Sequence, residues 1–358
     1  MFKRKLIILA IHCLLPAASY GQAEATQLEE VQVEGHYQNY IGESVSTSEG
    51  TIGNAEIQKR PLMRVGEILE FVPGMAVTQH SGSGKSNQYF LRGFNLDHGT
   101  DFSLHVDKMP INMRTHGHGQ GYVDMNFIIP EMVQRMDYQK GVYYPKNGDF
   151  SSAGAAHIVL PNSLESGLAS VELGQYGHQR GVLMDEFKAG DSARLLMALE
   201  AQGYEGPWKN IDESVGKKNL HARYIDKVQT GQYSVTLMGY DNAWNSADQI
   251  PQRAVDIGLI DSYGSINDSV GGESSRYSLS GEWLGNNGVT ASAYMIRSKM
   301  NLWSDFTYYL ENENQGDEFE QVDDRNIFGG TLSYLQDLPS INRPISSGMI
   351  CYNMRHEK

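Results

Sequence analysis

The sequence predicts an α+β domain followed by a transmembrane antiparallel β-sheet. Three observations predict this fold class: an N-terminal export signal, a first block with mixed helix and strand signals, and a second block, from about residue 166, in which apolar and polar residues alternate. The net charge of -14 over 358 residues argues against bulk nucleic-acid binding, which requires a basic face.

The N-terminus has the layout of a secretory signal peptide over residues 1–21. Lys3, Arg4 and Lys5 precede an apolar stretch at residues 6–15, and Pro16 leads into small residues. A membrane anchor is the alternative, but this stretch is half of the roughly 20 residues that span a bilayer. Cleavage removes Cys13, and one remaining cysteine, Cys351, excludes a disulfide scaffold.

The first block mixes short helical and strand signals. Val65, Ile68 and Leu69 fall on one face of a predicted helix at residues 64–71, which the Val-Pro-Gly string at 72–74 ends. Strand-like pieces follow at residues 89–92, 104–107, 135–141 and 157–160. This block is expected to fold as a compact α+β domain.

The second block alternates with period two. Tyr277, Leu279 and Trp283, for example, lie opposite polar neighbours. Short turns alternate with long polar loops, which is typical of an outer-membrane barrel. A soluble β-sandwich would alternate too, but the export signal and the tyrosine-rich strand ends favour the barrel. About eight strands are predicted, near 168–176, 180–189, 192–203, 217–228, 232–241, 274–284, 289–300 and 326–337.

Five strings in the first block occur in a characteristic order: EEVQV at 29–33, RPLMRVGEILEFVPG at 60–74, LRGF at 91–94, VDKMP at 106–110 and PEMVQRMDYQKG onward from 130 to 160. Together they resemble the plug domain of TonB-dependent outer-membrane receptors over residues 26–165. The resemblance implies a signal peptide at 1–21, a TonB box and linker at 22–50, a plug domain at 51–165 and a partial β-barrel at 166–358.

The length of the second block sets an expectation for the barrel. Receptors of this family resemble the plugged barrels of roughly 22 strands, whereas 193 residues (358 minus 165) follow residue 165. We therefore expect a truncated barrel of about 8 of roughly 22 strands, and residues 350–358 do not form a terminal alternating strand that closes on an aromatic residue.

The resemblance assigns the TonB box to Glu29, Glu30, Val31, Gln32 and Val33. Strand addition explains the assignment physically, because backbone groups supply hydrogen bonds while alternate valines fill shallow pockets. A flexible polar tail is the alternative. The implied partners are TonB with ExbB and ExbD, outer-membrane lipid, and an extracellular small-molecule or metal-chelate ligand.

Other positions that match the plug pattern are expected to be structural. Arg92 and Asp107 are predicted to form ion pairs or turns, and Lys108 stands where the family often has glycine. Tight turns that need positive φ are predicted at Gly141, Gly148 and Gly154.

The resemblance implies that two plug loops, residues 78–88 and 111–122, contact the ligand. Imidazole suits Zn, Cu, Ni or Fe, so His116 and His118 are candidate metal contacts, although surface histidines can simply form hydrogen bonds. Arg114 is an alternative clamp for carboxylate or catecholate groups. The candidate ligand-binding residues are Gln79, His80, Arg114, His116 and His118.

The first of these loops contains Gly84-Lys85-Ser86, which superficially suggests a phosphate loop. Gln79 stands where that pattern requires glycine, so nucleotide binding is not expected. No nucleophile-elbow or zincin string is present, so neither an enzyme nor a cofactor is expected.

The predicted function is TonB-driven import of a scarce nutrient, with a ferric siderophore or another metal complex as the expected cargo. Free metal, haem, cobalamin and oligosaccharide remain open. A secreted or surface β-rich module that binds a ligand without transport is the alternative.

Overall fold

The computed structural model describes residues 43–46, 48–80, 82–336 and 348–357, all within one compact unit. The predicted signal peptide and the residues predicted to bind TonB, 29–33, lie outside the described residues.

The first domain contains two small sheets and short helices. Its six-stranded sheet has the order β1-β2-β8-β9-β6-β7, in which only β6 and β9 pair in parallel, and a second sheet has the order β3-β4-β5. The strands are β1 (Glu43–Ser46), β2 (Glu49–Gly53), β3 (Met75–Thr78), β4 (Gln88–Leu91), β5 (Phe94–Asn95), β6 (Phe102–Val106), β7 (Met109–Pro110), β8 (Arg135–Lys140) and β9 (Gly154–Val159). The helices are α1 (Asn54–Lys59) and the 3₁₀ turns η2 (Val65–Phe71), η3 (Pro130–Met132) and η4 (Pro145–Asn147).

The predicted helix near residue 65 is present as the 3₁₀ helix η2. Val65, Ile68 and Leu69 are buried, as their spacing predicts. The helix stops before Pro73, and Gly74 turns the chain with φ +89°.

The turn positions predicted for the first domain are confirmed. Gly141, Gly148 and Gly154 have φ of 90°, 69° and 149°. Asp107 has φ 50° in the turn between β6 and β7, and Arg92 has φ 53°. These two polar residues therefore hold left-handed turn conformations, in line with their predicted structural role.

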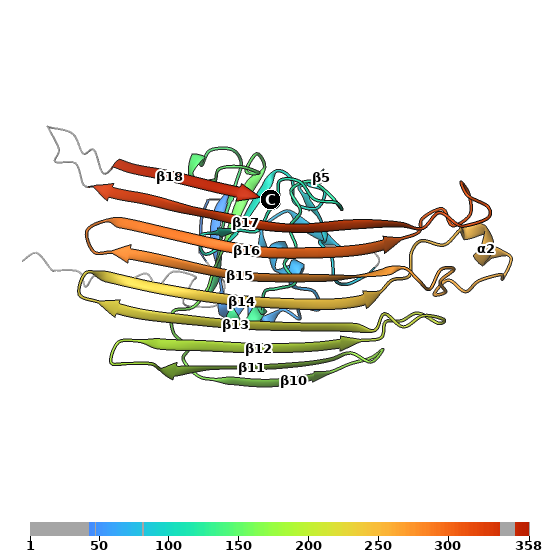
Figure 1. Ribbon diagram of the computed structural model, residues 1–358, viewed down its shortest axis with the longest axis horizontal. Helices are drawn as coiled ribbons and strands as arrows, with labels where there is room; N and C mark the ends of the chain where they lie inside the picture. Colours follow the sequence, from blue (N-terminus) through green and yellow to red (C-terminus); the bar gives the residue numbers. More distant parts are fainter. Residues whose placement is uncertain (1–42, 47, 81, 337–347, 358) are drawn as a thin grey trace, which may run out of the picture. The chain divides into compact units, whose positions relative to one another are not determined.

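The second domain is one antiparallel wall, whose strands pair in chain order (Figure 1). All eight predicted strands are present, with ends shifted by a few residues. The strands are β10 (Leu168–Leu173), β11 (Gln179–Lys188), β12 (Arg194–Tyr204), β13 (Val215–Val228), β14 (Gly231–Asn245), β15 (Gly271–Gly285), β16 (Val289–Ser304), β17 (Phe319–Gln336) and β18 (Gly348–Glu357).

A ninth strand, β18, adds to the about eight strands predicted for the wall. It pairs with β17 from Ile327↔Glu357 to Gln336↔Gly348. Its sequence, GMICYNMRHE, does not alternate cleanly between apolar and polar residues, so pairing with β17 rather than local pattern defines the strand. Cys351 lies on β18, opposite Ser333.

The alternation along the wall is inverted relative to a soluble protein. Large apolar side chains are exposed, such as Leu183 (56%) and Leu237 (45%), whereas charged and polar side chains on the other face are buried, such as Glu200 (3%) and Arg223 (4%). A soluble sandwich would bury the apolar face instead. An apolar outer face with a polar inner face is the arrangement of a barrel wall in a membrane, so the sandwich alternative is excluded.

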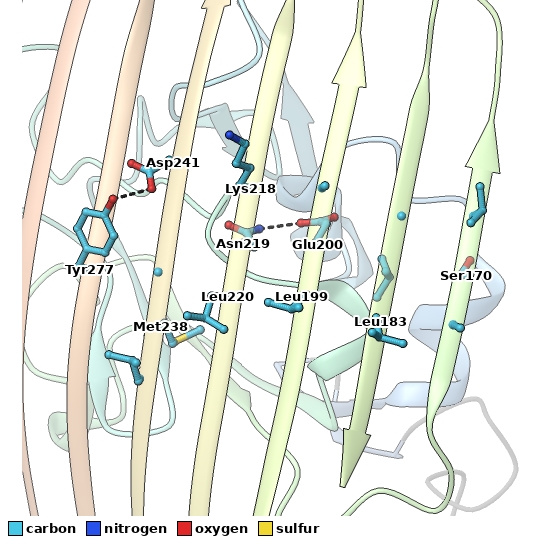
Figure 2. A pocket seen from close by; sticks show the side chains of 17 residues that line it. Ser170, Leu183, Leu199, Glu200, Lys218, Asn219, Leu220, Met238, Asp241 and Tyr277 are labelled. Carbon is cyan, nitrogen blue, oxygen red and sulfur yellow. Dashed lines mark hydrogen bonds between the residues drawn. The ribbon is translucent and has the colours of Figure 1, made fainter.

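The outer face also carries an open hollow of about 650 Å³ across β10 to β15 (Figure 2). Its floor has small residues, including Gly181 and Gly239, and Leu199 and Leu237 also line it. The hollow belongs to the apolar outer surface and is not the candidate ligand site. No helix in the described ranges is long and apolar enough to cross a bilayer.

Buried ion pairs join the first domain to the wall. Arg180 on β11 donates to both carboxylate oxygens of Glu131 on η3, at 2.7 and 2.8 Å, and to Glu200 on β12, at 2.5 Å. Lys217 lies 3.1 Å from Glu200. These charges are mutually compensated, as burial requires.

A second link lies farther along the wall. Arg223 on β13 donates to Asp107 at 2.7 Å and to Asn162 at 2.9 Å. A single hydrophobic core contains side chains from both domains, including Phe127 of the first and Tyr240 and Ile296 of the wall. The two domains therefore share one core.

We predict that Arg180→Ala lowers the free energy of unfolding by about 3–5 kcal/mol, because it leaves Glu131 and Glu200 buried without their partner. The matched control is Arg194→Ala, which removes an exposed pair with Glu186 at 3.2 Å and should cost at most about 1 kcal/mol. Urea unfolding in detergent micelles measures both. Equal effects would contradict the assignment of Arg180 to the link between domains.

We also predict that Leu237→Arg, at the middle of β14 on the outer face, destabilises the protein in phospholipid vesicles by about 2–4 kcal/mol. Val228→Arg, at the end of β13 on the same face, should cost only about 0–1 kcal/mol, because charge is tolerated near the interface. Refolding titrations into vesicles compare the two variants. A wall that does not face lipid would show no such dependence on depth.

Candidate functional site

The two plug loops predicted to meet ligand lie at the end of the wall that carries the long connections. These connections are residues 205–214, 246–270 and 305–318, and the second contains α2 (Gln252–Asp256). The Ser274 hydroxyl donates to the Gly84 carbonyl at 2.8 Å. His118 contacts Gln321, close to where β17 begins. The structure therefore brings both loops to one end, which we call the apex.

Close approach to Trp244 explains the glycines of the first loop. A Cβ atom on Gly82 would lie 2.4 Å from the Trp244 indole nitrogen, and one on Gly84 would lie 2.0 Å from the Trp244 ring. Ser86 donates to the Val123 carbonyl at 2.6 Å, and Lys85 is buried. The Gly84-Lys85-Ser86 string therefore serves packing against the wall.

His116 is held tightly between the two domains. Its ring stacks on Tyr122 with centroids 3.7 Å apart, and its side chain is 1% exposed. The His118 backbone N–H donates to His116 Nδ1 at 3.2 Å, so the ring proton resides on Nε2, which lies 3.7 Å from Asp323 Oδ1. Burial lowers the pKa of His116 to about 4, although Asp323 opposes that shift.

His118 has the opposite tautomer. The Gln321 amide donates to the Gly117 carbonyl at 2.6 Å, which turns its oxygen toward His118 Nδ1 at 3.0 Å. Nδ1 must therefore carry the proton, and Nε2 presents a lone pair. In the described part of the chain, this buried Nε2 has no hydrogen-bond partner. Burial lowers the pKa of His118 to about 3.

Two further histidines continue the cluster toward solvent. The His98 ring lies 4.5 Å from the His118 ring and 5.5 Å from that of His80. His98 is buried and its Nδ1 donates to the Asn87 carbonyl at 3.1 Å, whereas His80 is exposed. Burial is the main cause that lowers the pKa of both rings, so the apex imidazoles are neutral at pH 7.

The remaining two candidates lie beside this cluster or away from it. Gln79 donates to the Gly82 carbonyl at 2.9 Å and so shapes the first loop. Arg114 pairs with Asp149 at 3.5 Å and lines a different cavity, of about 860 Å³, between the plug sheet and the wall. Arg114, the predicted clamp, therefore lines a cavity that His116 and His118 do not line.

The described side chains do not by themselves form a complete metal centre. Within the described ranges, no group of three or more His, Cys, Asp or Glu side chains is placed to hold an ion. The predicted contact of His116 and His118 with a metal stays a prediction. Any metal at the apex would need ligands from its own chelate or from water.

Sequence reasoning missed several residues of the apex. Gln321 and Asp323 are about 200 residues away from their histidine partners, so no local pattern reveals them. Two other residues could have been found from the sequence. His98 belongs to the concentration of histidines between residues 80 and 118, and Lys85 is part of the Gly84-Lys85-Ser86 string.

Comparison with known proteins agrees with this architecture. Residues 42–155 match the family described as the TonB-dependent receptor plug domain. A segment of 174 residues is 26% identical to the vitamin B12 transporter BtuB of Vibrio vulnificus, covering 48% of this chain and 27% of that relative.

Solved structures give the same result for the fold. The ferric-catecholate import receptor Fiu from E. coli K12 superposes with a TM-score of 0.66 at 13% identity, over 87% of this chain and 47% of that one. The siderophore receptor PirA from Acinetobacter baumannii gives 0.57 at 13% identity, over 81% and 46%. The copper transporter OprC gives 0.59 at 16% identity, over 82% and 43%.

The chain thus spans less than half the length of these relatives. The order of strings in the sequence, the inverted wall and these similarities agree with one another. Residues 42–155 match the TonB-dependent receptor plug domain, and together with the nine strands that follow they have the fold of part of these solved structures.

Proposed function

We propose that this chain acts within an outer-membrane receptor that imports a ferric siderophore or another metal complex, driven by TonB with ExbB and ExbD. Export through the signal peptide at residues 1–21 would deliver it to the outer membrane. The long-connection end would face the outside, and residues 29–33 would pair with TonB in the periplasm.

The observation that carries the proposal is the apex cluster of imidazoles. Three neutral histidine rings of the two plug loops gather with that of His98, at the end of the wall that carries the long connections. Neutral imidazole offers nitrogen lone pairs and N–H donors, which suit transition metals and their complexes. Relatives with the same fold are named for ferric-catecholate and copper transport, which supports this class of cargo.

The apex is also mechanically coupled to the wall. His118 contacts Gln321, and the Gly117 N–H donates to Asp323 at 3.3 Å. Displacement of the plug by TonB would break these contacts and so disturb the ligand site. Binding and plug movement would then be linked by shared contacts.

A receptor that binds without transport is the alternative, and we predict that Val31→Pro separates the two. Proline removes the backbone N–H needed for strand addition, so uptake should fall to background while ligand binding is unchanged. Val31→Ala is the control and should keep most uptake, because its backbone donor remains. Undiminished uptake of labelled cargo by the proline variant would contradict the TonB-box assignment.

For the cargo, we predict that His116→Ala/His118→Ala weakens binding of metal chelates roughly tenfold to a hundredfold, equivalent to about 1–3 kcal/mol of lost contacts. The control removes a second pair, His105→Ala/His157→Ala, whose stacked rings line the 860 Å³ cavity instead. A panel of ferric siderophores, free metals and haem is titrated against each protein. Unchanged chelate affinity in the apex variant would exclude the apex as the binding site.

A further inference from the structure

We propose that His98 and His118, rather than His116 and His118, form a two-imidazole site for a borderline transition-metal ion, with exposed His80 as its entry. Both rings would bind through Nε2. This inference rests on the proposed function, since it names the metal-binding atoms of the same apex. Three lines of observation support it.

The first is the pattern of protonation set by the neighbours. Nδ1 of His118 faces the Gln321 oxygen, and Nδ1 of His98 faces the Asn87 carbonyl, so both Nδ1 atoms are donors. Each neutral ring therefore presents its lone pair at Nε2. Fixing one ring nitrogen by a hydrogen bond is how proteins orient histidine toward a metal.

The second is an unsatisfied acceptor. Nε2 of His118 is fully buried and, among the described residues, lacks a hydrogen-bond partner. Nε2 of His98 lies 3.7 Å from Asp97 Oδ1, too far for a hydrogen bond. A buried lone pair without a donor is unfavourable, and a cation at this point would satisfy it.

The third is geometry. Two imidazoles on one ion, with metal–nitrogen bonds of about 2.1 Å, place their ring centres roughly 4.5 to 5.2 Å apart for bond angles between about 90° and tetrahedral. The observed separation of the His98 and His118 rings is 4.5 Å. The ring of His80 is exposed and lies 5.5 Å from that of His98.

The charges around the two rings include one that favours a bound cation and one that disfavours it. The Asp97 carboxylate beside His98 favours a cation, whereas Lys85 disfavours one, and both influence the His98 ring. Burial lowers the pKa of Lys85, and the nearby Asp248 opposes that shift. Since the described residues provide no third metal-ligating side chain in place, water or the cargo's chelate completes the coordination.

His116 is excluded as a ligand by its own contacts. Its Nδ1 accepts the His118 N–H, and its protonated Nε2 points to Asp323. Neither nitrogen has a lone pair available. His116 and His118, which are separated only by Gly117, therefore have different roles. His116 holds the loop, and His118 offers its Nε2 to the metal.

The test uses asparagine at all three positions, because its side chain reproduces the δ-position hydrogen bond and lacks the ε nitrogen. Detergent-solubilised protein is titrated with Zn²⁺ and Co²⁺ alone by calorimetry. His98→Asn and His118→Asn should each weaken binding at least about tenfold, whereas His116→Asn should stay within about twofold of wild type. Cu²⁺ resonance spectra should report two bound nitrogens in wild type and one in His118→Asn.

Wild-type affinity in His98→Asn and His118→Asn would overturn the proposal, as would an equal loss in His116→Asn. If His98→Asn does not fold, His118→Asn and the nitrogen count still decide. The result is distinguishable from the transport proposal, because metal binding is measured without TonB. A metal site in a protein that imports nothing would sink transport alone, and TonB-dependent uptake without metal binding would sink this site alone.

Discussion

The polar inner face of the wall is the constraint on which the rest of the structure depends. Glu200, Lys217 and Arg223 are buried charges on adjacent strands, and burial of an unpaired charge costs several kcal/mol. Lys217 pairs with Glu200, and Arg223 pairs with the plug residue Asp107. The plug residue Glu131 pairs with Arg180 of the wall. The outer face carries the complementary set of exposed apolar side chains, such as Leu183 and Leu237, as the outside of a membrane barrel wall does.

These pairings also decide where the ligand site lies. Because Glu131 and Asp107 are fixed to β11 and β13, the plug loops meet the wall near the long connections. There, the glycines of the first loop pack against Trp244, and residues 116–118 contact β17. His98, His116 and His118 become buried in consequence, which keeps them uncharged and leaves the Nε2 lone pair of His118 without a partner among the described residues. The ion pairs between plug and wall thus lead to buried, neutral imidazoles, which are a type of ligand that suits transition metals.

Much of the fold could be predicted from local sequence. The period of two along β10 to β17, the apolar face of η2 and the glycines at positive φ are consequences of side-chain direction and backbone sterics, which act over a few residues. β18 was not predictable in this way, because its alternation is weak and its pairing with β17 defines it. The short helix α1 and strands β1 to β3 were also not anticipated.

The residues of the candidate site could likewise be predicted only in part from local sequence. Sequence alone identified the two loops and four apex candidates, Gln79, His80, His116 and His118, because residue type and motif are read directly from the chain. Tertiary structure decided the rest. It moved Arg114 to another cavity, brought Gln321 and Asp323 to the histidines across about 200 residues, and assigned different tautomers to His116 and His118. A ring nitrogen is a donor or an acceptor only through the atoms that face it, and those atoms are neighbours in space rather than in sequence.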